Sequence, residues 1–151
     1  MNVVEQFYTA FQAKDAKGMK ACYHAEIEFE DPAFGLLKGD QAGMMWQMLC
    51  EQGKDLEISF RDVIIDGDQA SAKWEAKYTF SRTGRWVHNR ISASFRLKDN
   101  LIIEHKDEFN LHRWARQAMG FQGALLGWTK FFKAKFQVTA KKALGKYIAH
   151  Q

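Results

Sequence analysis

His105 and Asp107 lie two positions apart in the segment Leu101–Phe109, in which outward charged residues alternate with a second set that includes Ile103 and Phe109. Alternation with a period of two is typical of a half-buried strand. It places His105 and Asp107 on the same face, with Cα atoms about 6.6 Å apart. A carboxylate beside an imidazole prepares the ring to accept a proton and stabilises the resulting cation. The pair is therefore a candidate for general acid/base catalysis.

Two further polar residues are expected on the same covered face. Asp31 ends a short alternating segment just before the only proline, and Asn89 lies on the apolar face of a later alternating segment. Polar side chains in an apolar enclosure are costly unless they are hydrogen-bonded. We predict that Asp31 takes part in proton transfer with His105 and Asp107, and that Asn89 contacts a ligand. A buried hydrogen-bond network with a purely structural role is the alternative.

Several aromatic residues could line a cavity for a flat, hydrophobic ligand, although such residues more often belong to a core. The candidates are Phe29, Trp74, Tyr78, Tyr8 and Trp46. The sequence has no Cys/His spacing typical of a metal site, and the glycines at 35, 39 and 43 do not form a phosphate-binding loop. We therefore expect neither a metal nor a cofactor.

The elements that must position these residues follow from the hydrophobic periodicity. Helices are expected from Val3 to Phe11, from Ala16 to Tyr23 and after Asp40, whereas Phe34–Gly39 is expected to form a loop. A short strand covers Ile27–Asp31, and four longer strands follow: Leu56–Ile65, Ala70–Phe80, Trp86–Leu97 and Leu101–Phe109. Helices followed by hairpin-linked strands indicate an α+β fold with an antiparallel sheet covered on one face.

This order of elements, together with two motifs, resembles a known superfamily. The segment Val3–Pro32, with Phe29-Glu30-Asp31-Pro32 at its end, resembles the opening of ketosteroid isomerases. Ile103-Glu104-His105-Lys106-Asp107 resembles the closing strand of the SnoaL-like polyketide cyclases. Both belong to the nuclear transport factor 2-like superfamily. The resemblance implies a cone of strongly curved antiparallel sheet, with three N-terminal helices over its concave face closing an apolar pocket.

The resemblance also implies roles for individual residues. Asp31 falls where the isomerases keep their proton-shuttling carboxylate, and Asp107 falls where the cyclases keep their acid/base aspartate. The two oxyanion-hole donors of the isomerases are replaced here by Phe7 and Ala93. The expected function is that of a cofactor-independent cyclase, isomerase or hydrolase acting on a small hydrophobic carbonyl compound. A non-catalytic carrier of a small apolar ligand is the alternative. A homodimer that pairs through the outer face of the sheet is also implied.

Charge divides the chain into two parts. All 18 acidic residues lie in residues 1–108, whereas residues 109–151 carry eight lysines and arginines and no acid. We predict a SnoaL-like domain over residues 1–112 and a basic, amphipathic helical extension over residues 113–151. The extension is expected to dock across the pocket mouth or on the partner subunit. Peripheral membrane contact through residues 129–151 is the alternative, and no nucleic acid is expected as a partner.

Length and composition exclude several other classes of protein. A chain of 151 residues with 46% hydrophobic and 26% charged residues fits one folded domain rather than a disordered chain. No apolar run approaches the about 20 residues that a membrane-spanning helix needs. The first residues do not resemble a secretory leader. With only Cys22 and Cys50, both expected to be reduced and buried, we predict a cytoplasmic protein.

Overall fold

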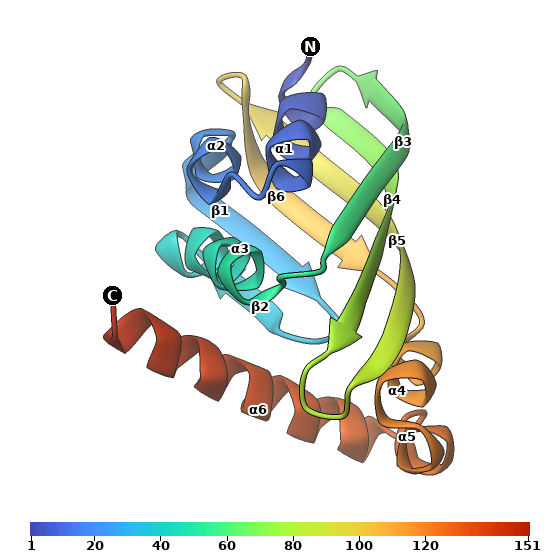
Figure 1. The fold of residues 1–151 in the computed structure, drawn as a ribbon. Helices are drawn as coiled ribbons and strands as arrows, with labels where there is room; N and C mark the ends of the chain where they lie inside the picture. Colours follow the sequence, from blue (N-terminus) through green and yellow to red (C-terminus); the bar gives the residue numbers. More distant parts are fainter.

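A curved sheet and three short helices form the body of the protein in a computed structural model that describes all 151 residues (Figure 1). The helices are α1 (Val3–Gln12), α2 (Ala16–Ala21) and α3 (Asp40–Gln52). The strands are β1 (Tyr23–Asp31), β2 (Gly35–Lys38), β3 (Glu57–Asp66), β4 (Gln69–Phe80), β5 (Arg85–Lys98) and β6 (Leu101–Glu108). The expected α+β class, with a cone-shaped sheet, is confirmed.

The six strands form one sheet in the order β2-β1-β6-β5-β4-β3. Four of the five neighbouring pairs are antiparallel, as expected, but β1 and β6 run parallel to each other. Their register pairs Phe29 with His105 and Glu30 with Lys106. One position further along this register, Asp31 lies beside Asp107. Neighbouring strands of a sheet are about 4.8 Å apart, so the two residues are close to each other.

The segment expected to be a loop after Phe34 contains strand β2. Gly35 has a φ of +70°, a conformation that glycine adopts without steric cost, so the chain can reverse there and pair with β1. Leu37 lies opposite Phe29 in this pair, and both side chains are fully buried. Burial of Leu37 thus favours a strand where the glycines alone predicted a loop.

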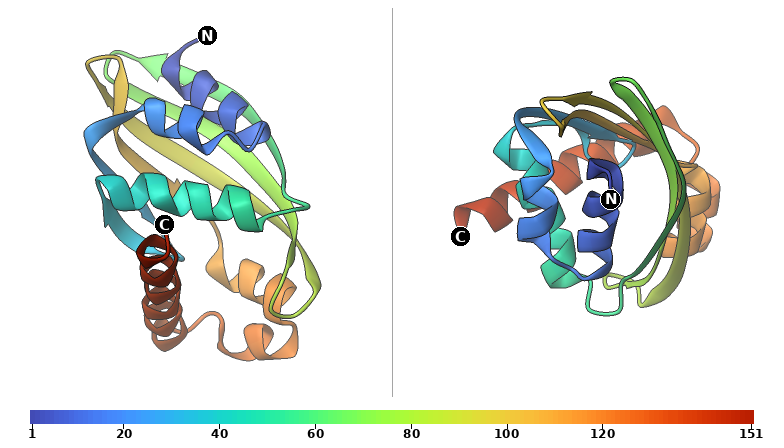
Figure 2. Two further views of the ribbon diagram at one scale, coloured as in Figure 1. Left: turned by 60° about the vertical axis from the view of Figure 1, so that its left-hand side comes forward. Right: turned by 90° about the horizontal axis from the view of Figure 1, so that it is seen from above.

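The three N-terminal helices cover the concave face of the sheet (Figure 2). Helix α1 begins with a capping box, in which Asn2 accepts a hydrogen bond from the backbone of Glu5 and Glu5 accepts one from the backbone of Asn2. Its inner face then buries side chains at helical spacing, which join α3 and the sheet in one core: Val4, Phe7, Tyr8 and Phe11. This core surrounds His105 and Asp107.

Residues 109–151 form three helices, α4 (Leu111–Met119), α5 (Phe121–Leu126) and α6 (Lys130–Ala149). Asn110 caps α4 by accepting a hydrogen bond from the backbone of Arg113, as the sequence predicts. Helix α6 runs across one end of the body, below α3 in Figure 1. The side chains on its inner face recur every four residues: Phe132, Phe136, Ala140 and Leu144. None of the helices is long and apolar enough to cross a membrane.

Leu144 is the best-buried residue of α6, with 1% of its surface exposed. We expect Leu144→Ala to lower the free energy of unfolding by about 2–4 kcal/mol, because truncation removes apolar contacts and leaves a cavity. The measurement is urea denaturation followed by circular dichroism. Val138→Ala, on the exposed side of the same helix, is the matched control and should change stability by less than about 0.5 kcal/mol. Equal stabilities for the two variants would show that α6 is not held by this contact.

Candidate active site

A cavity of about 300 Å³ lies between the sheet and α3. Of its 23 lining residues 16 are hydrophobic, so a bound ligand must present a mostly apolar surface. The two acidic groups of the lining are Asp31 and Asp107, and Asn89 adds an amide. We call this space the central cavity.

Helices α4 and α6 contribute part of the wall of the central cavity, through Trp114, Phe136 and Ala140. Trp114 also donates a hydrogen bond of 2.7 Å from its indole N–H to the hydroxyl of Tyr78. The sequence predicts a helix near the pocket mouth, but Trp114, Phe136 and Ala140 are not among the candidate site residues. The four-residue spacing from Phe132 to Leu144 is the signal that could have indicated the inner face of α6.

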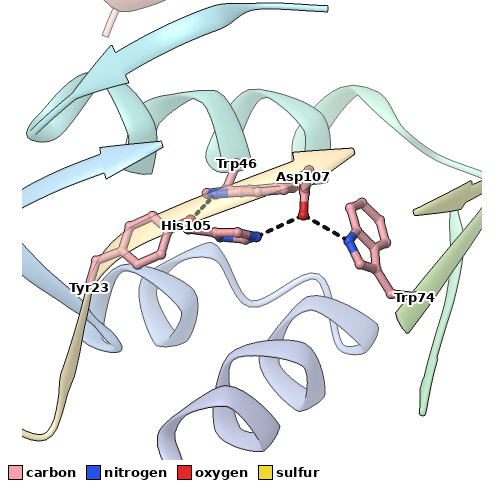
Figure 3. A network of polar contacts seen from close by, with 5 residues as sticks. All are labelled: Tyr23, Trp46, Trp74, His105 and Asp107. Atoms are coloured by element: carbon pink, nitrogen blue, oxygen red, sulfur yellow. Dashed lines mark hydrogen bonds and ion pairs between the residues drawn. The ribbon is translucent and has the colours of Figure 1, made fainter. Parts of the chain in front are cut away.

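A chain of hydrogen bonds leads from α3 through the core to Asp107 (Figure 3). The indole N–H of Trp46 donates to the hydroxyl of Tyr23 at 2.8 Å, and this hydroxyl contacts Nδ1 of His105 at 2.7 Å. Nε2 of His105 lies 2.9 Å from Oδ1 of Asp107. The indole N–H of Trp74 donates to the same oxygen at 3.2 Å. Both His105 and Asp107 are almost fully buried.

The direction of this chain follows from counting donors. The oxygen of Tyr23 already accepts from Trp46, so its own proton has only Nδ1 of His105 to bond. Nδ1 must then be the acceptor, and the proton of the neutral imidazole sits on Nε2, where it is donated to Asp107. An imidazolium would leave the buried O–H of Tyr23 without a partner, which is costly. The surroundings therefore favour a neutral His105 that holds the Asp107 carboxylate.

The two hydrogen bonds to Asp107 both end on Oδ1. Oδ2 receives none from the protein, although Asp107 lines the central cavity. Oδ2 is therefore the oxygen available to a ligand, while Oδ1 fixes the orientation of the carboxylate.

Asp31 has a different environment from Asp107. Its Oδ1 accepts hydrogen bonds from the backbone N–H groups of Ala33, at 2.9 Å, and Phe34, at 2.6 Å, in the turn that leads to β2. Burial raises the pKa of Asp31 from 3.8 to about 7; the backbone N–H of Phe34 opposes this shift, and the nearby Asp107 carboxylate adds to it. Near neutral pH Asp31 is present both as an acid and as a carboxylate.

The structure brings together most of the residues that the sequence analysis selected. Asp31, Asn89 and Asp107 all line the central cavity. So do three of the aromatic candidates: Trp46, Trp74 and Tyr78. His105 is not part of the lining, because the rings of Phe7, Phe29, Trp46 and Phe95 surround its imidazole. His105 therefore reaches the central cavity only indirectly, through its hydrogen bond to Asp107.

Phe29 and Tyr8, the other two aromatic candidates, lie in the core and not in the cavity wall. Phe29 is covered by Trp46 and His105. Tyr8 packs against Phe60 and Trp74, and its buried hydroxyl has no hydrogen-bond partner. Alternation along a strand or helix identifies the inward face, but it does not show whether neighbours fill the space in front of a side chain.

The model of the SnoaL-like domain family matches residues 4–105, which is more than half of the chain and includes His105. The chain therefore belongs to the SnoaL-like family, within the nuclear transport factor 2-like superfamily that the element order resembles. No curated protein matches the sequence.

Solved structures with the same fold are numerous but distant in sequence. A protein from Jannaschia sp. CCS1 assigned as a SnoaL-like polyketide cyclase superposes with a TM-score of 0.66 at 15% identity, covering 76% of this chain and 88% of its own. An epoxide hydrolase of Mycobacterium tuberculosis gives 0.62 at 19% identity, with 83% and 88% covered. TerC, co-crystallised with polyporic acid, gives 0.60 at 19% identity, with 72% and 88% covered. At these identities the likeness establishes the fold alone.

The raised pKa of Asp31 predicts a pH-dependent stability. An acid whose pKa is higher in the folded than in the unfolded state binds its proton more strongly when folded, so stability is lost as the pH rises from about 4 to about 7. The slope from this group is at most about 1.4 kcal/mol per pH unit. We expect Asp31→Asn, measured by urea denaturation across this range, to flatten the profile and to exceed the wild-type stability above pH 7. Asp66→Asn, at an exposed site on β3, is the control and should leave the profile unchanged.

Proposed function

We propose that this protein is a cofactor-independent acid/base catalyst that moves a proton next to a carbonyl group of a small, mostly apolar compound, as a cyclase or isomerase does. The observation that supports this most is the pair Asp31 and Asp107. The two carboxyl groups lie on adjacent strands and line one apolar cavity, but the protein surrounds them differently. Carboxyl groups with unlike environments are suited to opposite roles, one as acid and one as base.

Asp107 is the base in this proposal. Its Oδ1 is held by His105 and Trp74, so Oδ2 is oriented to accept a proton from the carbon beside the carbonyl. The electron pair of that C–H bond forms the C=C bond of an enol, and the π electrons of the carbonyl take up a proton on oxygen. Return of the proton from Asp107 to carbon, at the same or at a conjugated position, completes the reaction and restores the base.

Asp31 is the acid in this proposal, because a pKa of about 7 keeps it protonated in a large part of the molecules in neutral solution. It donates that proton to the carbonyl oxygen as the enol forms and recovers it when the carbonyl returns. Tyr78 lines the same cavity, and its hydroxyl accepts from Trp114. The O–H of Tyr78 can thus donate a second hydrogen bond to the substrate oxygen. Asp31 and Tyr78 would together stabilise the substrate oxygen. They would thus take the role of the two oxyanion-hole donors of the isomerases, whose positions are occupied here by Phe7 and Ala93.

The lining indicates the class of substrate. Indole and phenyl rings from three different helices and from β4 face the cavity: Trp46, Trp74, Trp114 and Phe136. Such a wall fits a flat ring system with one or two oxygen atoms better than a charged metabolite. TerC, which shares the fold, has been crystallised with polyporic acid, and this supports a cyclic substrate of the same kind here.

The decisive variant is Asp107→Asn. We expect purified protein to accelerate hydrogen–deuterium exchange at the carbon beside the carbonyl of 2-tetralone in D₂O, followed by proton NMR. Asp107→Asn should lower the protein-dependent rate by at least about 10³-fold, because an amide cannot act as the base. Asp66→Asn is the matched control and should retain the full rate.

Each other outcome of this assay contradicts the proposal. An unchanged rate in Asp107→Asn would remove this residue from the mechanism. Binding of 2-tetralone without exchange would indicate a ligand carrier. Opening of styrene oxide, tested in parallel, without exchange of 2-tetralone would indicate an epoxide hydrolase. Circular dichroism of both variants verifies that the fold is retained.

Tyr23 is a positioning residue in this proposal, because it touches His105 and not the cavity. Tyr23→Phe removes the proton that holds Nδ1 as an acceptor, so Nε2 is no longer fixed as the donor to Asp107. We expect kcat for the exchange to fall by about tenfold with KM nearly unchanged. Tyr147 on α6 donates its hydroxyl proton to Glu51 and to no member of the network, so Tyr147→Phe should leave both constants unchanged. A rise in KM alone would indicate that Tyr23 shapes the cavity rather than orients the base.

We further propose that the protein is a cytoplasmic homodimer that pairs through the outer face of β4 and β5. Two free, buried cysteines, Cys22 and Cys50, are consistent with a reducing compartment. The outer face presents side chains of both charge signs, among them Lys73, Arg90 and Glu75, although Glu75 also pairs with His88 and Arg90 of its own copy. Light scattering coupled to size-exclusion chromatography measures the mass, and a monomer at micromolar concentration would contradict the dimer.

A further inference from the structure

Helix α5 and the start of α6 lie at the lower right of Figure 1, and five large apolar side chains of this region are exposed. More than half of the surface of each is exposed, and we call them the apolar tip: Phe121, Leu125, Leu126, Trp128 and Phe131. They fall within eleven consecutive residues of a chain whose other large apolar residues are mostly buried. Large exposed apolar side chains gathered within one short segment indicate an interaction site.

The exposure of the apolar tip is enforced by the packing of α5 on α4. A Cβ on Gly123 would lie 1.9 Å from the backbone oxygen of Ala115, and one on Gly127 would lie 2.6 Å from the Ala115 side chain. Only glycine fits at these two positions. The side of α5 that carries Gly123 therefore packs closely against Ala115 of α4. The large residues of α5 must then face away from the body.

Helix α6 continues this surface on its outer side. At 100° per residue, the direction opposite to Phe136, Ala140 and Leu144 is occupied by Phe131, Val138, Ala149 and Lys142. Exposed lysines flank this outer stripe on both sides: Lys130 and Lys141 on one, Lys135 and Lys146 on the other. Apolar side chains surrounded by lysines can enter a membrane interface while the ammonium groups reach the lipid headgroups.

Charge distinguishes the partners that could cover this surface. No acidic residue occurs after Glu108, and the first residue of β5 adds a further positive charge: the guanidinium of Arg85 is bonded to the backbone of Gln117 in α4. A symmetric contact between two copies would place like charges against each other, because the same patch faces itself across a two-fold axis. The surface therefore complements an anionic partner rather than a second copy of this chain.

The apolar tip favours a bilayer over a nucleic acid. Leucine side chains offer no stacking surface for bases, whereas they insert readily among acyl chains. A tryptophan beside leucines and phenylalanines is suited to the boundary between headgroups and hydrocarbon.

We propose that the apolar tip and the outer side of α6 form a docking surface for a bilayer that contains anionic phospholipid. The protein binds in the plane of the interface and does not span it, with the apolar tip inserted and the lysines at the phosphate groups. The inner side of α6 meanwhile remains part of the cavity wall, so docking places the central cavity next to a source of hydrophobic compounds.

The test is co-sedimentation of the full chain with vesicles of phosphatidylcholine containing phosphatidylglycerol, compared with vesicles of phosphatidylcholine alone. We expect binding only to the anionic vesicles. The triple variant L125S/W128S/F131S should weaken it by at least about tenfold. The pair I64S/I65S, which removes two exposed apolar side chains from β3, is the matched control and should bind as the wild type does.

Charge and insertion are tested separately. K135E/K142E should weaken binding by at least about tenfold, since each lysine near an anionic surface contributes roughly fivefold in affinity. Trp86 and Trp128 are the exposed tryptophans. In a W86F background, the emission of Trp128 should therefore shift to shorter wavelength when anionic vesicles are added.

Four outcomes would overturn the proposal. They are absence of vesicle binding, equal binding to neutral vesicles, unchanged binding of the triple variant, and tighter binding to duplex DNA in a fluorescence anisotropy titration than to vesicles. A concentration-dependent increase in mass that the triple variant abolishes would instead assign the surface to self-association. Because vesicle binding is measured without substrate, its failure leaves the exchange assay on 2-tetralone unaffected, and the two proposals can be judged apart.

Discussion

The structure depends on burying a carboxylate in an aromatic core. Asp107 is about as buried as the apolar residues around it, and a charge in such a place is tolerated only when donors compensate for the water it has lost. Trp74 and His105 supply those donors, and Tyr23 and Trp46 complete the chain behind His105. Each of these side chains comes from a different element, so the sheet, α3 and β1 must all be in place for the carboxylate to be stable. The hydrogen bonds from His105 and Trp74 fix Oδ1 of Asp107, whereas Oδ2 accepts none from the protein.

Much of this arrangement could be predicted from the sequence, since it follows from periodicity. The alternation in β4, β5 and β6 identifies the strands and the covered face, and with it the shared orientation of His105 and Asp107. The turn composition between strands and the capping residue Asn110 also have local causes. Such features need no knowledge of distant neighbours, because the residues that determine them are close in the chain.

The parts that could not be predicted depend on contacts between distant segments. The parallel pairing of β1 with β6 brings Asp31 beside Asp107, although they lie 76 positions apart in the sequence. Tyr23 was expected in a helix, but it begins β1 and reaches His105. Phe29 and Tyr8 face inward as expected, and yet neighbouring rings fill the space in front of them. Composition and spacing carry no information on which of two inward side chains meets empty space.

Helix α6 supplies part of the cavity wall from the far end of the sequence, and this has a consequence for how the protein is made. Residues 1–108 leave the ribosome first and can assemble the sheet, the buried Asp107 and the three N-terminal helices. Phe136 and Ala140 follow only later, so the nascent body stands open at one end until α6 arrives and folds onto it. The central cavity is thus enclosed only late in biosynthesis, and a hydrophobic compound could enter the unfinished molecule before its last wall is in position.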